Sequence, residues 1–203
     1  MQTVWLSGQE IIPSKVVCIG RNYVEHIAEL NNEVPTEPVI FVKPNSAISS
    51  QIKTHAVDEV HYEAEISLIV KDNQFIGAGI GLDLTKRQVQ SVLKSKSLPW
   101  ERAKGFDASA VFSEFVAINN EVDTLSLVLS INDAVIQQAN YDLMIYKPNQ
   151  IVDAVKEFMS FETNDILMTG TPKGVGKIKQ GDKFTGQLFA QGELLLSKDW
   201  VVL

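Results

Sequence analysis

The chain has 203 residues, of which 45% are apolar and 21% charged, as in an ordinary globular protein. Its net charge of −7 and the lack of a Lys/Arg-rich block argue against a nucleic-acid partner. A single cysteine fits a reducing compartment, and no apolar run approaches the roughly 20 residues that a membrane-spanning helix needs. We therefore expect a cytoplasmic protein with no membrane partner and one domain over residues 1–203, with residues 1–15 as an N-terminal extension packed on it.

The first predicted element is a buried strand over residues 15–19 (KVVCI), ended by Gly20. Cys18 lies inside this apolar run, so we expect a buried and unreactive thiol. A short helix is predicted next, in GRNYVEHIAEL. Asn22 is the expected N-cap, and Glu25, three residues later, completes a capping-box pattern.

His26 and Glu29 are three residues apart, which makes them neighbours on one face of this helix. A carboxylate beside an imidazole orients the ring and raises its basicity, as a general base requires. The alternative is a surface helix with incidental charges, and this segment by itself does not decide between the two.

A polar loop with two prolines is predicted over residues 31–38, and the strand PVIFVKP follows it. Lys43 stands between apolar residues and Pro44 in this strand. Its ammonium either reaches the surface along its aliphatic stem or projects into a cavity. Residues 45–59 are polar and irregular.

HYEAEISLIV, residues 61–70, is predicted to be a strand that carries two carboxylates at its start. Residues i and i+2 of a strand face the same side, so Glu63 and Glu65 point toward one place. Two like charges so close together repel unless a positive group lies between them, and a divalent cation would serve. The alternative is a solvated, acidic strand face.

After a turn at residues 71–74, FIGAGIGLDLT is predicted to be a glycine-rich second strand. GAGIG lacks the spacing of a phosphate-binding loop and indicates close backbone packing in a sheet. Asp83 is either a helix-start signal or a third ligand. Thr85 is the better cap for a helix over residues 85–96, which leaves Asp83 as a third oxygen donor. Three carboxylates favour Mg²⁺ or Mn²⁺ over zinc.

The remaining residues predict further strands and one more helix. Residues 98–116 are expected to be mostly loop and then strand, with Lys104 on a flexible turn. A hairpin is expected over residues 125–139, a short strand over residues 166–169, and antiparallel strands over residues 182–203. Residues 150–161 form the clearest amphipathic helix, with a core face made of Ile151, Val152, Val155, Phe158 and Met159.

Four separated segments, taken together, resemble the fumarylacetoacetate hydrolase family. They are GRNYVEHIAEL, HYEAEISLIV, GLDLTKRQVQ with LPWERAKGFD, and DILMTGTPKGVG, in this order. The resemblance runs from about Val16 to the C-terminus and is closest to the single-domain acylpyruvate hydrolase and oxaloacetate decarboxylase branch. It implies an α+β fold, in which mixed β-sheets roll into a barrel-like core with few short helices, and a homodimer.

The resemblance also implies roles for individual residues. The metal ligands for Mg²⁺ or Mn²⁺ would be Glu63, Glu65 and Asp83. His26 and Glu29 would activate water on a mobile lid, and Lys104 would hold developing negative charge. The positions expected to bind substrate are Arg21, Lys43, Arg87, Gln90 and Thr171. Residues 71–81 are shorter here than in many relatives, which leaves the ligands in place but alters one wall of the pocket.

The function implied is metal-dependent cleavage of a carbon–carbon bond in an acylpyruvate, or decarboxylation of oxaloacetate, through an enolate of pyruvate. A second hypothesis is an isomerase or tautomerase acting on a 2-hydroxy-dienoate or a 2-oxo dicarboxylic acid. A third is a non-enzymatic β-rich module that binds Ca²⁺. In the two enzymatic hypotheses the partner is a small 2-oxo acid.

Overall fold

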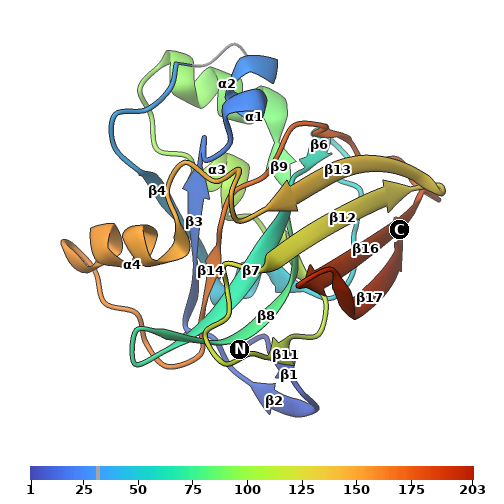
Figure 1. Cartoon of the computed structure of the whole chain (residues 1–203). Coiled ribbons are helices and arrows are strands. Elements are labelled where there is room, and N and C mark those ends of the chain that lie inside the picture. The colour runs from blue at the N-terminus through green and yellow to red at the C-terminus, as the bar shows by residue number, and fades with distance from the viewer. Residues whose placement is uncertain (31–32) are drawn as a thin grey trace.

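The computed structural model describes residues 1–30 and 33–203, and it has the α+β architecture that the resemblance implies (Figure 1). Strands form most of the ordered structure, and the helices are short. The helices are α1 (Val24–Glu29), α2 (Arg87–Ser95), α3 (Glu101–Lys104) and α4 (Pro148–Lys156), with a 3₁₀ turn at Asn45–Ala47. No helix in the described part of the chain has the length and apolarity needed to cross a membrane.

A mixed, eight-stranded sheet forms the centre of the molecule, and seven of its strands run in the order β4-β3-β14-β7-β8-β10-β5, with β11 paired to β8. These strands are β3 (Lys15–Gly20), β4 (Val39–Pro44), β5 (Ile48–Ser49), β7 (Ala64–Lys71), β8 (Gln74–Asp83), β10 (Ala110–Phe112), β11 (Val116–Ala117) and β14 (Asp165–Met168). β14 runs parallel to β3 and antiparallel to β7, so segments far apart in sequence meet at the middle of the sheet.

Three smaller sheets surround this centre. The antiparallel four-stranded sheet crosses one face of it (Figure 1) and has the order β13-β12-β16-β17. Its strands are β12 (Leu125–Ile131), β13 (Ala134–Asn140), β16 (Lys183–Ala190) and β17 (Glu193–Val201). A three-stranded sheet contains β6 (Val60–Tyr62), β9 (Thr85–Lys86) and β15 (Gly176–Lys177), and a hairpin contains β1 (Val4–Leu6) and β2 (Gln9–Ile11).

The larger apolar core contains buried side chains from both the eight-stranded and the four-stranded sheets. Leu68 and Ile80 come from the first sheet, and Leu127 and Phe184 come from the second. Strand alternation sends Ile69, the neighbour of Leu68, to a second core on the opposite face. The central strands are therefore buried on both faces and hold the residues at their ends in fixed positions.

The predicted strand over residues 61–70 is divided in two at Glu63. β6 ends at Tyr62 and belongs to the three-stranded sheet, whereas β7 begins at Ala64 in the eight-stranded sheet. The backbone N–H of Asp83 donates to the Glu63 carbonyl at 2.8 Å, so the end of β8 lies beside this break. The acidic residues consequently lie where two sheets diverge.

The glycines of β8 allow close packing, as GAGIG predicts. A Cβ at Gly81 would lie 2.3 Å from Ser67 Oγ, and one at Gly79 would lie 2.8 Å from the Phe115 ring. Neither position therefore has room for a side chain.

Both predicted helix caps are wrong. The N-cap of α1 is Tyr23, with no side-chain hydrogen bond, and that of α2 is Lys86. Asn22 is buried and instead donates to the carbonyls of Tyr146 and Thr169, at 2.9 and 2.8 Å. The Asn22 amide binds these distant backbone carbonyls, and it therefore does not cap α1 as the local sequence pattern predicts.

Two other expectations about helices need correction. Lys104, expected on a flexible turn, is the last residue of α3 and is buried. The predicted amphipathic helix ends at Lys156, five residues early, and Phe158 is 65% exposed. The core side of α4 therefore consists of Ile151, Val152 and Val155.

Candidate active site

Three buried carboxylates converge at the break between β6 and β7. Glu63, Glu65 and Asp83 each offer an oxygen, and these oxygens lie within 4.8 Å of one another. Asp83 arrives from the end of β8, because β8 pairs with β7 so that Leu82 lies opposite Ala64. The structure thus places together the three residues that the sequence predicts as metal ligands.

The Lys104 ammonium lies between two of these carboxylates. Its Nζ is 2.8 Å from Glu63 Oε2, 2.6 Å from Asp83 Oδ2 and 2.7 Å from the Thr85 hydroxyl. Burial opposes the charged form of Lys104, but Asp83 and Glu63 outweigh burial and raise the pKa of Lys104. Asp83 and Glu63 therefore favour the charged form of this buried lysine.

The two glutamates differ in their partners. Burial alone would raise the pKa of Glu63, yet the ion pairs with Lys104 and Arg87 hold it well below its usual range. Glu65 accepts the Gly170 backbone N–H at 2.6 Å and has no cation within ion-pair distance in the described part of the chain. Burial, and then Asp83 and Glu63, raise the pKa of Glu65.

This imbalance fits a divalent cation. Among the described residues, Glu65 is a buried carboxylate without a positive partner, and all three converging donors are oxygens. Oxygen donors suit hard cations such as Mg²⁺ and Mn²⁺. The residues present therefore fit the metal that the resemblance implies.

Lys43 lies beneath the triad and not in an open cavity. It is fully buried, and it donates to the backbone carbonyls of Lys104, Leu84 and Ser109, the last two at 3.3 and 3.0 Å. Its Nζ is also 2.8 Å from Asp83 Oδ1. Lys43 thus holds the α3 and β10 segments against β8 and neutralises Asp83 from below.

His26 and Glu29 form the predicted pair on α1. His26 Nδ1 lies 3.1 Å from Glu29 Oε2, and the His26 ring is buried. Glu29 Oε1 also accepts the N–H of Gly174, at 3.0 Å, which links α1 to the TGTPKGVG loop. Gly174 has φ +100°, and a Cβ there would lie 2.3 Å from the Ile136 carbonyl, so this contact requires glycine.

A small pocket above Lys104 brings together residues from α1, α2 and α3. It is lined by His26, Glu63 and Lys104 and by three predicted substrate-binding residues, Arg21, Arg87 and Gln90. Arg87 donates one N–H to Glu63 and another to Gln90 Oε1, the latter at 2.8 Å.

Arg21 has φ +56°, an uncommon conformation for a residue with a side chain. Its buried Nε has no hydrogen-bond partner among the described residues. Since no carboxylate of the described chain pairs with it either, its guanidinium can receive an anion from outside.

Thr171 lies outside this pocket and supports the ligand strand. Its hydroxyl donates to the Ala64 carbonyl at 2.9 Å and accepts from Gln137 Nε2 at 2.9 Å. Gln137 also accepts the Ala64 N–H at 3.0 Å, so both backbone groups between the two glutamates are fixed. Gln137 reaches Ala64 because it lies on β13 of the four-stranded sheet. No sequence motif marks Gln137.

Two further pocket residues have no role predicted from the sequence, although one of them has a sequence signal. Lys94 and Trp100 line the same pocket. Lys94 follows Arg87 and Gln90 at the spacing i, i+3, i+7, which is one helical face. Extending that face by one turn identifies Lys94 from sequence.

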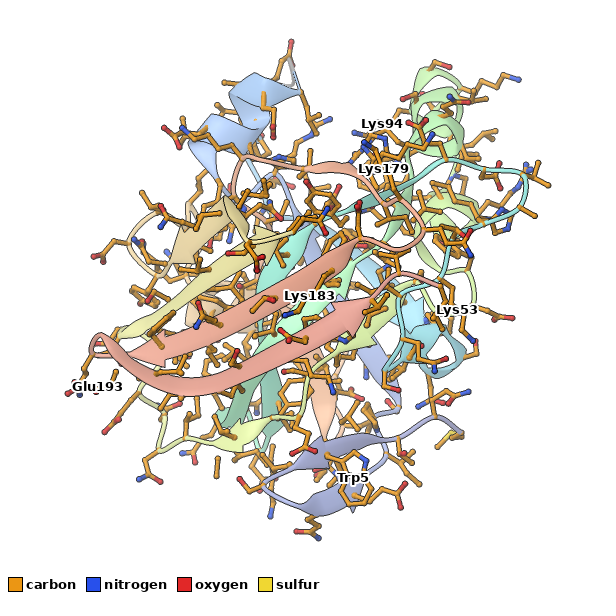
Figure 2. All side chains as sticks on the ribbon, turned by 90° about the vertical axis from the view of Figure 1, so that its right-hand side faces the viewer. Trp5, Lys53, Lys94, Lys179, Lys183 and Glu193 are labelled. Atoms are coloured by element: carbon orange, nitrogen blue, oxygen red, sulfur yellow. The ribbon has the colours of Figure 1, made fainter. Side chains whose placement is uncertain are left out.

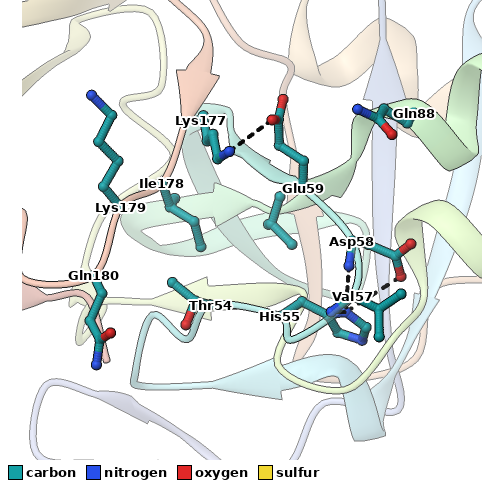
Figure 3. A pocket seen from close by; sticks show the side chains of 11 residues that line it. Thr54, His55, Val57, Asp58, Glu59, Gln88, Lys177, Ile178, Lys179 and Gln180 are labelled. Atoms are coloured by element: carbon teal, nitrogen blue, oxygen red, sulfur yellow. Dashed lines mark hydrogen bonds and ion pairs between the residues drawn. The ribbon is translucent and has the colours of Figure 1, made fainter.

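A larger cavity of about 490 Å³ lies elsewhere, between residues 54–60 and residues 177–180 (Figure 3). Both of its carboxylates already have positively charged or imidazole partners. Glu59 lies 2.9 Å from Lys177 and 2.8 Å from His61, and Asp58 lies 3.0 Å from Lys86. Because these carboxylates are already neutralised, this cavity is a weaker candidate for a reaction site than the pocket beside the triad.

Comparisons with known proteins agree with this geometry. The chain is 38% identical to an oxaloacetate tautomerase, mitochondrial, of Schizosaccharomyces pombe, over 88% of this chain and 90% of that one. It is 35% identical to an oxaloacetate tautomerase of Escherichia coli, over 85% and 87% of the two chains. A crystal structure from Oleispira antarctica, provisionally identified as a fumarylacetoacetate isomerase/hydrolase, matches with a TM-score of 0.95 and 34% identity over 100% of both chains.

The family model described as fumarylacetoacetate hydrolase C-terminal matches residues 15–195, which include every element that builds the pocket. The chain belongs to the fumarylacetoacetate hydrolase family.

Proposed function

We propose that this protein is a metal-dependent oxaloacetate tautomerase, which interconverts the keto and enol forms of a dicarboxylic 2-oxo acid. The observation that carries the proposal is a pocket lined by His26, Lys104 and Glu63, with the oxygens of Glu65 and Asp83 buried within 4.8 Å of that of Glu63. The relatives from S. pombe and E. coli, both named oxaloacetate tautomerases, support the choice of reaction.

Charge balance supports a dianionic substrate. The three carboxylates are faced by three cations, Lys43, Arg87 and Lys104. A divalent cation would leave this group with two net positive charges, which a dicarboxylate would neutralise. When bound to the triad, Mg²⁺ or Mn²⁺ would supply Lewis acidity toward the keto and carboxylate oxygens of the substrate.

The proton transfer is assigned to the chain's own residues. His26, oriented by Glu29, accepts a proton from C3 of the keto form as the C2–C3 double bond forms. The π electron pair of the C2 carbonyl moves to its oxygen, where the positive charge of Lys104 stabilises the enolate. That oxygen then takes a proton from water, and His26 returns the C3 proton to solvent. The reverse sequence returns the keto form, and no oxidant or reductant is consumed.

Carbon–carbon hydrolysis of an acylpyruvate is the second candidate, and the His26–Glu29 hydrogen bond favours it. The same dyad would activate water, and the same enolate would leave. Decarboxylation of oxaloacetate shares this enolate. These activities remain predictions, as do the choice between Mg²⁺ and Mn²⁺, the homodimer, the cytoplasmic location and the single domain.

A substrate panel with Mg²⁺ tests the proposal: oxaloacetate, acetylpyruvate, fumarylpyruvate and a 2-hydroxy-dienoate, each assayed for tautomerisation and for pyruvate release. If the protein is a tautomerase, we expect rapid enol–keto exchange of oxaloacetate with little pyruvate formed. Rapid pyruvate release from an acylpyruvate, without catalysed exchange of oxaloacetate, would make hydrolysis the function.

His26→Ala tests the proton transfer assigned to His26. Tautomerisation and hydrolysis should both fall strongly, because the same ring would accept the C3 proton in one reaction and activate water in the other. Tautomerisation at the wild-type rate would show that His26 is not the base. The matched control is His55→Ala, since His55 lies by the larger cavity.

A further inference from the structure

Lys94 is a positively charged residue of the pocket to which the sequence analysis assigns no role. It lies on α2, and in Figure 2 its side chain is on the side of that helix toward α1. It lines the pocket together with Arg21, Arg87 and His26. The position at i+7 from Arg87 keeps it on the pocket face of α2, about 10 Å further along the helix axis.

The Lys94 ammonium is held in place and is not paired. Its Nζ lies 5.1 Å from the centre of the Trp100 ring, within cation–π range. No carboxylate in the described part of the chain lies within ion-pair distance of it, whereas Arg87 and Lys43 each have one and Lys104 has two. An aromatic contact therefore fixes the direction of this cation without neutralising it.

Arg21 is a second pocket cation with no carboxylate partner among the residues that the structure describes. Its Nε is buried without a partner among the described residues, and its φ of +56° is unusual. Two cations that face one pocket repel each other, and burial adds to that cost. An anion from outside the chain would relieve both.

The charged residues of the pocket thus differ in their pairing. Glu63 pairs with Arg87 and Lys104, whereas no carboxylate of the described residues pairs with Arg21 or Lys94. A 2-oxo acid with its chelating head at the triad would direct its other end toward these two cations.

We propose that Lys94 is a specificity-determining residue which, with Arg21, binds the distal carboxylate of a dicarboxylic substrate. This inference rests on the proposed function for the position of the head group. The lowered pKa of Lys94, about 8, agrees with a half-buried ammonium among cations. A solvated surface lysine, the ordinary alternative for a helix face, would not be half-buried beside Trp100.

Calorimetry on the Mg²⁺-loaded protein with two stable ligands tests this inference. L-malate and 2-hydroxybutyrate share a chelating hydroxy-acid head, but only malate carries the distal carboxylate. We expect Lys94→Met to weaken malate binding about tenfold and to leave 2-hydroxybutyrate within about twofold, because only malate loses a charge-assisted contact. Lys94→Arg should retain most of the malate affinity.

Lys96→Met is the matched control, since Lys96 is exposed at the end of α2 and lines no part of the pocket. It should change neither affinity. Equal losses for both ligands in Lys94→Met would mean that Lys94 only supports Trp100, and no loss for malate would mean that the subsite does not exist. Either result overturns the inference.

The proposed function can fail independently. If wild-type protein discriminates malate from 2-hydroxybutyrate through Lys94 but does not tautomerise oxaloacetate, the subsite stands and the reaction is wrong. If it tautomerises oxaloacetate and Lys94→Met has no effect on malate, the reaction stands and the subsite is wrong.

Discussion

Lys104 Nζ lies 2.6 Å from Oδ2 of Asp83, so a lysine from α3 neutralises the carboxylate at the end of β8. The same ammonium contacts Glu63 at 2.8 Å. Lys104 therefore competes with a metal ion for two of the three carboxylates while it also provides positive charge to the substrate. These two roles have opposite consequences when the lysine is removed.

Lys104→Met should bind Mg²⁺ more tightly than wild type, by about tenfold, because Glu63 and Asp83 lose their competing cation. Tautomerisation should fall by at least about a hundredfold, since the charge that stabilises the enolate is lost. Calorimetry and enol absorbance measure the two effects. Lys86→Met, outside the triad, is the control, and a parallel loss of metal affinity and activity would contradict the account.

Glu65 and Glu63 should respond differently to replacement by glutamine. Glu65→Gln removes an unneutralised buried carboxylate and should leave the metal-free protein as stable as wild type or more so, while abolishing stabilisation by Mg²⁺. Glu63→Gln leaves Lys104 and Arg87 with one partner fewer and should cost about 3 kcal/mol of unfolding free energy.

Thermal unfolding of both variants, with EDTA and with Mg²⁺, checks this contrast. Asp153→Asn is a suitable control, because the Asp153 side chain is exposed on α4. Similar destabilisation by Glu65→Gln and Glu63→Gln would show that the two glutamates have equivalent surroundings, against the structure.

Lys94 should impose a pH dependence on dicarboxylate use. Burial, and then Arg21, Arg87 and Lys104, lower the pKa of Lys94 to about 8, while Glu63 opposes the shift. The ammonium is charged below this pKa, so kcat/KM for oxaloacetate should decrease as pH rises through about 8. Lys94→Met should be low throughout and lack this step; identical profiles for the two proteins would count against Lys94.

Asp165 should be a stabilising residue that is remote from catalysis. It accepts hydrogen bonds from the Ser14 hydroxyl at 2.7 Å and the Glu162 N–H at 2.8 Å, and it pairs with Lys15. Asp165→Asn should destabilise the fold by about 3 kcal/mol without changing Mg²⁺ affinity. Urea unfolding and calorimetry measure the two quantities.

The contribution of Asp165 should disappear in acid. Burial would raise its pKa, but Lys15 and the surrounding hydrogen bonds hold the pKa below the usual 3.8. Its stabilisation is complete above that value and is lost as pH falls through the folded-state pKa. The stability difference between wild type and Asp165→Asn should thus narrow below about pH 4; a constant difference would exclude this charge effect.

The sequence predicts the carboxylate triad well, because strand spacing brings Glu63 and Glu65 to one place and Leu82 and Leu84 turn Asp83 toward it. It predicts the His26–Glu29 pair for a similar reason, since helical spacing is local. The break of the strand at Glu63 is not local. It depends on β6 pairing with β15 while β7 pairs with β14, partners that are more than 90 residues away.

The wrong predictions share this cause. Asn22 has a capping pattern, but its amide bonds to the backbone at Tyr146 and Thr169. Lys43 has two local interpretations, and neither foresees an ammonium bound by three backbone carbonyls from two other segments. Hydrogen-bond partners this distant in sequence follow from sheet order, which local patterns do not encode.

The enol–keto exchange of oxaloacetate tests the central claim most directly. Enol absorbance and pyruvate should be followed in the same sample, with Mg²⁺ and then with EDTA, for wild type and Glu65→Gln. We expect a rapid loss of enol absorbance that requires both Mg²⁺ and Glu65 and releases little pyruvate. Exchange no faster than in Mg²⁺ buffer alone, or equally fast in Glu65→Gln, would contradict it.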